Sequence, residues 1–196
     1  HECSSAASDV YKRQAMYGLH LDQFTTYDFD GFFHDRPVVF METENGGVKT
    51  ISAPHMIVTL LHHLELKEGH EVLVVGSKGG YIAALIATIV GEQGRVIVID
   101  PSEEIIRHTA NALNGWPTID LRHVESIDVA PIELPGELSR ILITGSVLSV
   151  PTWMEERIVE GGFVIAPIGD HHHQELMKNE RPVSYTHLTL PTSTHV

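Results

Sequence analysis

The chain has 196 residues, of which 42% are apolar and 20% are charged, and its formal net charge is −13. This length and composition are typical of one globular domain with a sizeable core. The balance of 13 basic against 26 acidic residues argues against a surface built to bind nucleic acid or an anionic membrane. No apolar run approaches the roughly 20 residues that cross a bilayer, and the single cysteine, Cys3, excludes an internal disulfide and fits a reducing compartment.

The two ends of the chain differ from its middle. Residues 1–14 and 182–196 carry no helical or strand period that continues into their neighbours, and they are similar to strings that recur at the edges of unrelated translated sequence assemblies. We therefore predict non-native tails at 1–14 and 182–196 around a single domain at 15–181. Ordinary frayed termini are the alternative.

The first predicted helix begins at Ser52-Ala-Pro54, where proline suits the first turn, and Met56, Leu60 and Leu64 follow at helical spacing. From Glu71 onward, short apolar runs alternate with amphipathic stretches, which is typical of βαβ units and a parallel sheet. The predicted strands, of which 119–123 has the weakest pattern, are Val72–Val75, Val96–Ile99, Ile119–His123, Ile141–Thr144 and Phe163–Ile168.

Three further helices are expected between these strands. One follows the first strand and ends at Gly91, and the next is capped by Ser102. Thr152 with Glu155 has the spacing of a capping box and predicts a short helix before the last strand. The fold class predicted is α/β, a doubly wound, mostly parallel sheet.

Ligands of such folds bind beyond the carboxyl ends of the strands. This rule places four segments in one crevice, namely Gly76–Gly80, Asp100, Val124–Ser126 and Thr144–Ser149. The glycines allow close approach of backbone N–H groups to a ligand, or else they only form a tight turn. Asp100 suits hydrogen bonds from ribose hydroxyls, although it also suits entry into the next helix. Together these features indicate a nucleoside-type cofactor.

The segment Thr50-Ile51-Ser52-Ala53-Pro54-His55-Met56, followed by a strand that ends in glycines, resembles protein-L-isoaspartate O-methyltransferases. The similarity covers roughly residues 15–178. It includes Asp35-Arg-Pro37 upstream and, further along, Gly80–Ala84, Gly94–Val96, Pro151, Gly161–Gly162, Pro167–Gly169 and Gln174–Leu176.

The resemblance implies a Rossmann-like class I methyltransferase that uses S-adenosyl-L-methionine. It would methylate the free α-carboxylate of L-isoaspartyl residues in damaged proteins. We expect a cytoplasmic monomer, with no nucleic-acid or membrane partner because of the acidic charge balance, and with no metal because no Cys or spaced His–His pair supports a zinc site. Transferred position by position, Ser52 is the catalytic hydroxyl, and Thr50, Ser52 and His55 bind the substrate. The cofactor residues implied are Gly76, Ser77, Gly80, Asp100 and Glu125. The alternative role for Ser52 is a helix N-cap before Pro54.

The sequence also departs from the family pattern. Val74 replaces the acid that usually precedes the glycine turn, and Lys78 replaces its middle glycine. Val124-Glu125-Ser126 replaces Gly-Asp-Gly, and the last strands of the family's sheet are expected to be missing. The alternative function is a non-catalytic homologue that binds peptides or proteins. A methyltransferase acting on RNA or a small molecule is disfavoured by the net charge and by the segment at 50–56.

Overall fold

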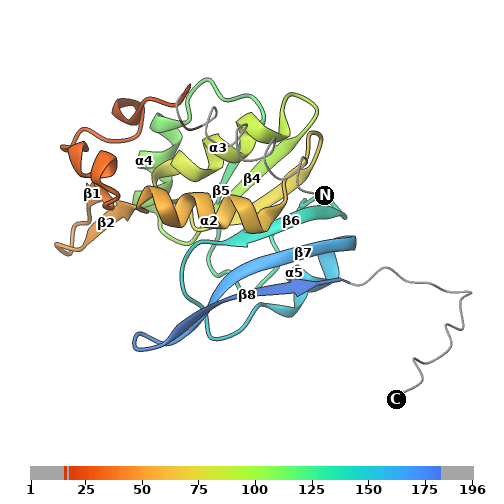
Figure 1. Cartoon of the computed structure of the whole chain (residues 1–196). Helices are drawn as coiled ribbons and strands as arrows, with labels where there is room; N and C mark the ends of the chain where they lie inside the picture. Colours follow the sequence, from red (N-terminus) through yellow and green to blue (C-terminus); the bar gives the residue numbers. More distant parts are fainter. Residues whose placement is uncertain (1–15, 17, 182–196) are drawn as a thin grey trace, which may run out of the picture.

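The computed structural model describes residue 16 and residues 18–181 of the chain. Its centre is a six-stranded sheet in the order β5-β4-β3-β6-β7-β8 (Figure 1). In chain order the strands are β3 (Glu71–Val75), β4 (Arg95–Asp100), β5 (Ile119–His123), β6 (Leu138–Ile143), β7 (Ile158–Gly169) and β8 (Gln174–Glu180). All neighbours pair in parallel except β7 and β8, which are antiparallel. The predicted fold class is confirmed.

The chain changes direction at the middle of the sheet. It runs outward from β3 through β4 to β5 and then returns to the other side of β3 as β6. In open α/β sheets such a switch point opens a crevice at the carboxyl ends of the two central strands. The residues that follow β3 and β6 are therefore those placed best to meet a ligand.

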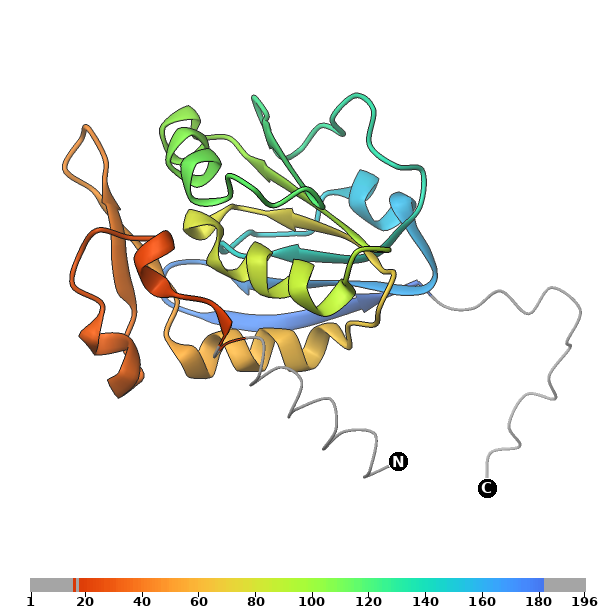
Figure 2. The same cartoon turned by 90° about the horizontal axis from the view of Figure 1, so that it is seen from above.

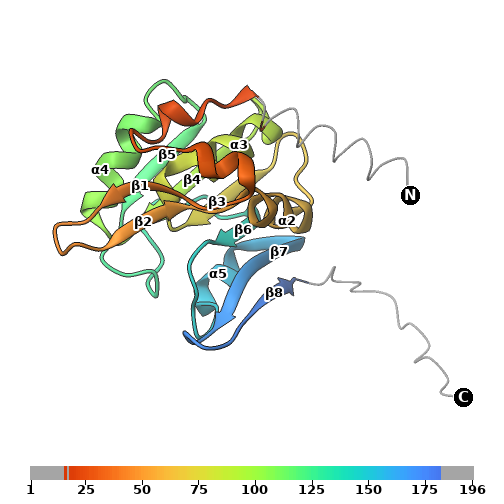
Figure 3. The same cartoon turned by 60° about the vertical axis from the view of Figure 1, so that its left-hand side comes forward.

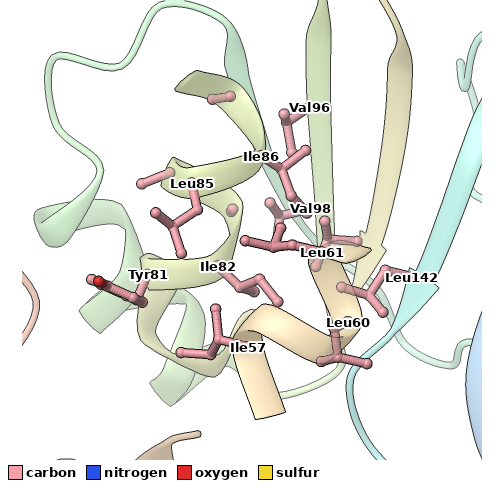
Figure 4. Packing of buried hydrophobic residues seen from close by; sticks show 14 of the residues in the cluster. Ile57, Leu60, Leu61, Tyr81, Ile82, Leu85, Ile86, Val96, Val98 and Leu142 are labelled. Carbon is pink, nitrogen blue, oxygen red and sulfur yellow. The ribbon is translucent and has the colours of Figure 1, made fainter. Parts of the chain in front are cut away.

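Helices cover both faces of the sheet. The helices α2 (Pro54–Leu64), α3 (Tyr81–Val90) and α4 (Glu103–Ala112) pack on one face, and α5 (Thr152–Arg157) packs on the other (Figures 1 and 2). Side chains alternate along β3, so that Val74 faces α3 whereas Val75 faces the α5 side. Figure 4 shows Ile57 and Leu61 of α2 packed among the side chains of α3 and the sheet.

An antiparallel hairpin stands beside the sheet, formed by β1 (Val38–Glu42) and β2 (Val48–Ile51) (Figure 3). Two 3-10 turns precede it, η1 (Leu21–Gln23) and η2 (Asp30–His34). Phe40 of β1 packs so closely on the glycine turn that a Cβ at Gly79 would lie 3.0 Å from its ring. The hairpin thereby brings the start of the 50–56 segment to the carboxyl ends of the sheet.

Most predicted elements are confirmed, and two details of the predicted helix starts are wrong. The hydroxyl of Ser102 accepts a hydrogen bond from the N–H of Ile105 (3.3 Å), as expected of the N-cap of α4. Thr152 does not form a capping box, because Pro151 holds the N-cap position and the cap has no side-chain hydrogen bond. Met56 is 43% exposed, since the buried face of α2 is formed by Ile57 and its neighbours at helical spacing.

Three strands were not predicted, namely β1 and β2 of the hairpin and β8. The predicted tails at 1–14 and 182–196 lie outside the described residues. In the part of the chain that the structure describes, no helix is both long enough and apolar enough to cross a membrane.

Candidate functional site

The turn after β3 carries the first functional features. Gly76, Lys78, Gly79 and Gly80 all have positive φ, between 47° and 93°. Glycine adopts this left-handed region readily, whereas a residue with a Cβ is disfavoured there. Lys78, with φ of 47°, is therefore held in a backbone conformation that suits the glycine of the family pattern.

Gly76 and Gly80 have different roles within this turn. A Cβ at Gly76 would overlap the hydroxyl of Thr144, which lies within hydrogen-bond distance of the carbonyl oxygens of Gly76 (2.8 Å) and Val75 (3.0 Å). Gly80 is buried, and a Cβ there would lie 2.9 Å from the side chain of Leu113. Gly76 thus lies at the open end of the turn, and Gly80 serves the packing of α3.

Asp100 ends β4 and is only 5% exposed. Its Oδ2 accepts a hydrogen bond from the N–H of Ser77, and its Oδ1 accepts one from the N–H of Ser102. Both distances are 2.9 Å. The carboxylate therefore fixes the glycine turn and the entry into α4 at once. Because each carboxylate oxygen has two lone pairs, both oxygens retain capacity to accept a ligand hydroxyl.

Ser77 contributes its backbone and not its hydroxyl. The side chain is fully buried, and its hydroxyl is hydrogen-bonded to the hydroxyl of Thr109 on α4 at a distance of 2.9 Å. It lines neither of the two cavities described next, so its hydroxyl is directed into the fold. This geometry leaves the predicted cofactor contact of Ser77 to its main chain.

A cavity of about 470 Å³ opens along the carboxyl ends of the central strands, and we call it the glycine-turn cavity. Gly76 and Asp100 line it together with the apolar side chains of Ile105 and Ile127, and Thr50 closes it from the hairpin. Its size is within the range of small-molecule sites, and it combines apolar walls with few polar groups. This arrangement suits a nucleoside that carries an aliphatic extension.

A second cavity of about 310 Å³ lies next to it, and we call it the Ser52 cavity. Its walls come from the start of α2, from the end of β6 and from Gln174 and Leu176 at the start of β8. Three residues line both cavities, namely Lys78, Ile143 and Thr144. The two spaces therefore adjoin at the carboxyl end of β6.

Ser52 does not cap α2. Ala53 holds the N-cap position and that cap has no side-chain hydrogen bond. Instead, Asp35 reaches the helix start from the preceding loop and accepts a hydrogen bond from the N–H of His55 (2.9 Å). Among the described residues none is hydrogen-bonded to the Ser52 hydroxyl, which is half-buried at the wall of its cavity. The capping alternative for Ser52 is wrong.

His55 lies at the edge of this region. Its Nδ1 lies 2.8 Å from Oδ2 of Asp35. The His55 side chain is 63% exposed and the Asp35 side chain 54% exposed. The hydrogen bonds from His55, first from its backbone and then from its ring, lower the pKa of Asp35. His55 lines neither cavity, whereas Ser52 and Thr50, the other predicted substrate residues, line one cavity each.

Glu125 is exposed and also lines neither cavity. The N–H of Val124 donates a hydrogen bond to the carbonyl oxygen of Asp100 (3.1 Å), which extends the β4–β5 pairing and directs the following loop. Ile127, two residues further, lines the glycine-turn cavity in the place expected for Glu125.

Sequence reasoning missed Lys49 and Gln174. Lys49 directly precedes the 50–56 segment and lines the glycine-turn cavity, and Gln174 lines the Ser52 cavity. Lys49 could have been identified from the sequence, because it is a basic residue next to the most specific motif of an acidic chain. The Gln174–Leu176 similarity was noted, but nothing local indicated that it faced the site.

Within residues 16 and 18–181, no group of three or more His, Cys, Asp or Glu side chains could hold a metal ion. The adjacent histidines at 171–173 lie in the exposed turn between β7 and β8. There Asp170 Oδ1 accepts hydrogen bonds from the backbone N–H groups of His172 (2.8 Å) and His173 (3.0 Å).

Residues 7–190 match the family model described as Protein-L-isoaspartate(D-aspartate) O-methyltransferase. A protein-L-isoaspartate O-methyltransferase of Methanopyrus kandleri is 35% identical over 150 residues, which are 75% of this chain and 66% of the relative. One of Methanosarcina mazei is 31% identical over 144 residues, or 71% and 57% of the two chains. The chain thus spans less than two thirds of the length of these relatives.

Solved structures show the same fold. A protein-L-isoaspartate O-methyltransferase superposes with a TM-score of 0.77 at 24% identity, over 88% of this chain and 56% of that one. A Plasmodium falciparum protein assigned to the same enzyme was solved with S-adenosyl-L-homocysteine. It superposes with a TM-score of 0.64 at 20% identity, over 87% of this chain and 89% of that one. The family match extends over most of the sequence and agrees with the identity of the archaeal relatives. The chain belongs to the protein-L-isoaspartate O-methyltransferase family.

Proposed function

We propose that this protein transfers a methyl group from S-adenosyl-L-methionine to the free carboxylate of L-isoaspartyl residues in damaged proteins. The resulting ester would collapse through a succinimide and so begin repair. One observation carries the proposal beyond family membership: the Ser52 cavity and the glycine-turn cavity adjoin at Lys78, Ile143 and Thr144. A methyl donor in one space and a carboxylate in the other would meet there.

The residues of the glycine-turn cavity fit this cofactor. Asp100 retains lone pairs for the ribose hydroxyls, and Ile105 and Ile127 offer apolar surface to a base. Gly76 lines the cavity and has no side chain of its own, which leaves its main chain available beside the aliphatic part. Val74 is fully buried in the apolar core, so this chain has no carboxylate at the position where the family pattern has one.

When bound, the cofactor supplies a methyl group on a positively charged sulfur. The substrate's carboxylate is an anion at neutral pH, so no residue has to remove a proton from it. The protein's task is therefore to align two groups and to exclude water. The half-buried Ser52 hydroxyl, which lines the Ser52 cavity, would donate a hydrogen bond to one carboxylate oxygen and so orient the other. Ile143, which is 1% exposed, supplies an apolar wall between the two spaces.

The proposal includes a cytoplasmic location, a monomeric protein, and isoaspartyl-containing peptides and proteins as partners. Of the substrate residues named from the sequence, Ser52 and Thr50 line the two cavities, and both are included here. His55 is included only as a residue at the rim, because its ring is engaged with Asp35.

Incubation with methyl-labelled S-adenosyl-L-methionine and an isoaspartyl peptide tests the function. A peptide of the same sequence with ordinary aspartate is the control. We expect label in the isoaspartyl peptide and none above background in the aspartyl peptide. Equal labelling of both peptides would reject the proposed substrate. Cofactor binding without any transfer would reject the proposed reaction and favour the non-catalytic alternative.

A further inference from the structure

The ionisable side chains around the two adjoining cavities are mostly basic, whereas the whole chain is acidic. The protein carries a net charge of −13, yet the ionisable side chains that line the cavities are Lys49, Lys78 and Asp100. Among the described residues, Lys78 is the single ionisable side chain that lines the Ser52 cavity. Asp100 lines the glycine-turn cavity with both lysines, but within the described residues it forms no ion pair with either of them.

Lys78 is the more informative of the two lysines. It is partly buried, and burial together with the nearby Lys49 lowers the pKa of its ammonium. Within the described residues, Lys78 makes no ion pair or side-chain hydrogen bond, and the same holds for Lys49. A partly buried cation beside a second cation, with no ion-pair partner among the described residues, is an unfavourable arrangement in the free protein.

The backbone at Lys78 adds to this cost. Its φ of 47° lies in the left-handed region, where glycine would be unstrained. Two unfavourable features at one residue are expected where a side chain serves a ligand and not the stability of the fold. The position of Lys78 at the boundary of both cavities gives that ligand a place.

We propose that Lys78, assisted by Lys49, binds a carboxylate at the boundary between the glycine-turn cavity and the Ser52 cavity. A carboxylate there has two sources, and this inference rests on the proposed function for both. The first is the amino-acid end of the cofactor, beside Gly76 and the glycine turn. The second is the isoaspartyl substrate, whose reacting carboxylate would enter from the Ser52 side.

The two sources predict different effects of Lys78 on the affinity for the cofactor. A cofactor carboxylate paired with Lys78 would remain paired when S-adenosyl-L-homocysteine binds, since this product has the same amino-acid end. A substrate carboxylate paired with Lys78 would leave the affinity for the cofactor unchanged. Lys49 lines only the glycine-turn cavity and is exposed, so its contribution is expected to be the smaller one in either case.

Calorimetric measurement of ligand affinity for the Lys78→Met variant distinguishes the cofactor from the substrate as the source of the carboxylate. This substitution retains the aliphatic chain and removes the charge. The probes are S-adenosyl-L-homocysteine and 5′-methylthioadenosine, which shares the adenosine and the thioether but has no carboxylate. If the cofactor is the source, the variant loses about tenfold or more in affinity for the first probe and less than twofold for the second. Lys67→Met, an exposed lysine outside both cavities, controls for the change in net charge.

A labelled isoaspartyl peptide, titrated in the presence of S-adenosyl-L-homocysteine, tests the other source without any turnover. If the substrate is the source, Lys78→Met weakens peptide binding about tenfold or more, and the same peptide with its α-carboxylate amidated binds both proteins equally weakly. Lys78→Arg, which retains a cation, should recover part of the affinity in whichever titration responds. Unfolding curves of each variant confirm that it is folded.

Unchanged affinity for both carboxylate ligands in Lys78→Met, or tighter binding of either, would overturn the proposal. A loss matched by Lys67→Met would overturn it as well, because the effect would then come from net charge. These titrations need no methyl transfer. Failure of the proposed reaction is therefore recorded separately, as binding without labelled product.

Discussion

The backbone N–H of Ser77 donates a hydrogen bond of 2.9 Å to Oδ2 of Asp100, and it joins the glycine turn to the end of the neighbouring strand. The same carboxylate accepts the N–H of Ser102 through its other oxygen. One buried side chain thus sets the conformation of two loops that border the glycine-turn cavity. Its role in the fold and its proposed role toward a ligand depend on the same atoms.

Asp100→Asn should therefore impair both stability and binding. An asparagine amide has one oxygen, so one of the two backbone N–H groups would face an NH2 group and lose its acceptor. We expect the free energy of unfolding to fall by about 1–3 kcal/mol and the affinity for S-adenosyl-L-homocysteine to fall about tenfold or more. Urea unfolding and calorimetry measure the two. Asp22→Asn, at an exposed position, is the matched control, and equal behaviour of both variants would contradict this role.

Ser52→Ala should reduce methyl transfer without affecting the fold. Ala53 is the N-cap of α2, and the Ser52 hydroxyl makes no hydrogen bond to the described residues. We expect a change in stability within about 0.5 kcal/mol and a loss of transfer rate of about tenfold or more. Ser102→Ala is the comparison, because Ser102 does cap a helix and its loss costs about 1 kcal/mol. A destabilised Ser52→Ala with normal transfer would reverse the assignment.

Lys78→Gly should raise the free energy of unfolding by about 1 kcal/mol. Glycine adopts a φ of 47° without the roughly 1–2 kcal/mol penalty of a side chain, although its larger unfolded-state entropy offsets part of the gain. Removal of a partly buried, unpaired ammonium acts in the same direction. Thermal and urea unfolding give the measurement. A less stable variant would show that Lys78 stabilises the fold, in conflict with a role toward a ligand.

His70 should make stability depend on pH between about 4 and 6.5. Burial, with smaller effects of Arg140 and Lys67, lowers its pKa from 6.5 to about 4, and its Nδ1 accepts a hydrogen bond from the N–H of Lys67 (3.1 Å). The unfolded chain binds the proton more readily than the folded one. The contribution is therefore complete above pH 6.5 and is lost as the pH falls toward 4.

We expect this loss to be about 1–3 kcal/mol between pH 7 and pH 4. The measurement is the free energy of unfolding against pH for the native protein and for His70→Asn, whose side-chain oxygen can accept the same hydrogen bond. The two curves should converge as the pH falls. Parallel curves over this range would show that His70 is not the group responsible.

The parallel sheet was predictable from sequence because its strands are buried on both faces and form continuous apolar runs. The glycine turn and Asp100 follow from the same pattern, since the carboxyl ends of such strands meet at one edge. β2 and β8 were not predicted because they are largely exposed and lack a continuous apolar run. β1 was missed although Val38–Met41 is a continuous apolar run. Lys49 and Gln174 were missed along with the strands that carry them.

The direction of individual side chains was the other limit of the sequence. Ser77 occupies a position typical of cofactor contacts, but its hydroxyl is directed to Thr109, a partner 32 residues away in the chain. Glu125 and Ile127 differ by two residues, and only the path of the loop after β5 decides which of them reaches the cavity. Such choices depend on tertiary packing, which a local pattern does not contain.

A crystal structure of the protein with S-adenosyl-L-homocysteine and an isoaspartyl peptide tests the central claim most directly. We predict that the ribose binds at Asp100, that the sulfur lies beside Ile143 and Thr144, and that the peptide carboxylate faces that sulfur from the side of Ser52. A cofactor bound away from the glycine turn, or a peptide carboxylate separated from the sulfur by the side chain of Lys78, would contradict the account.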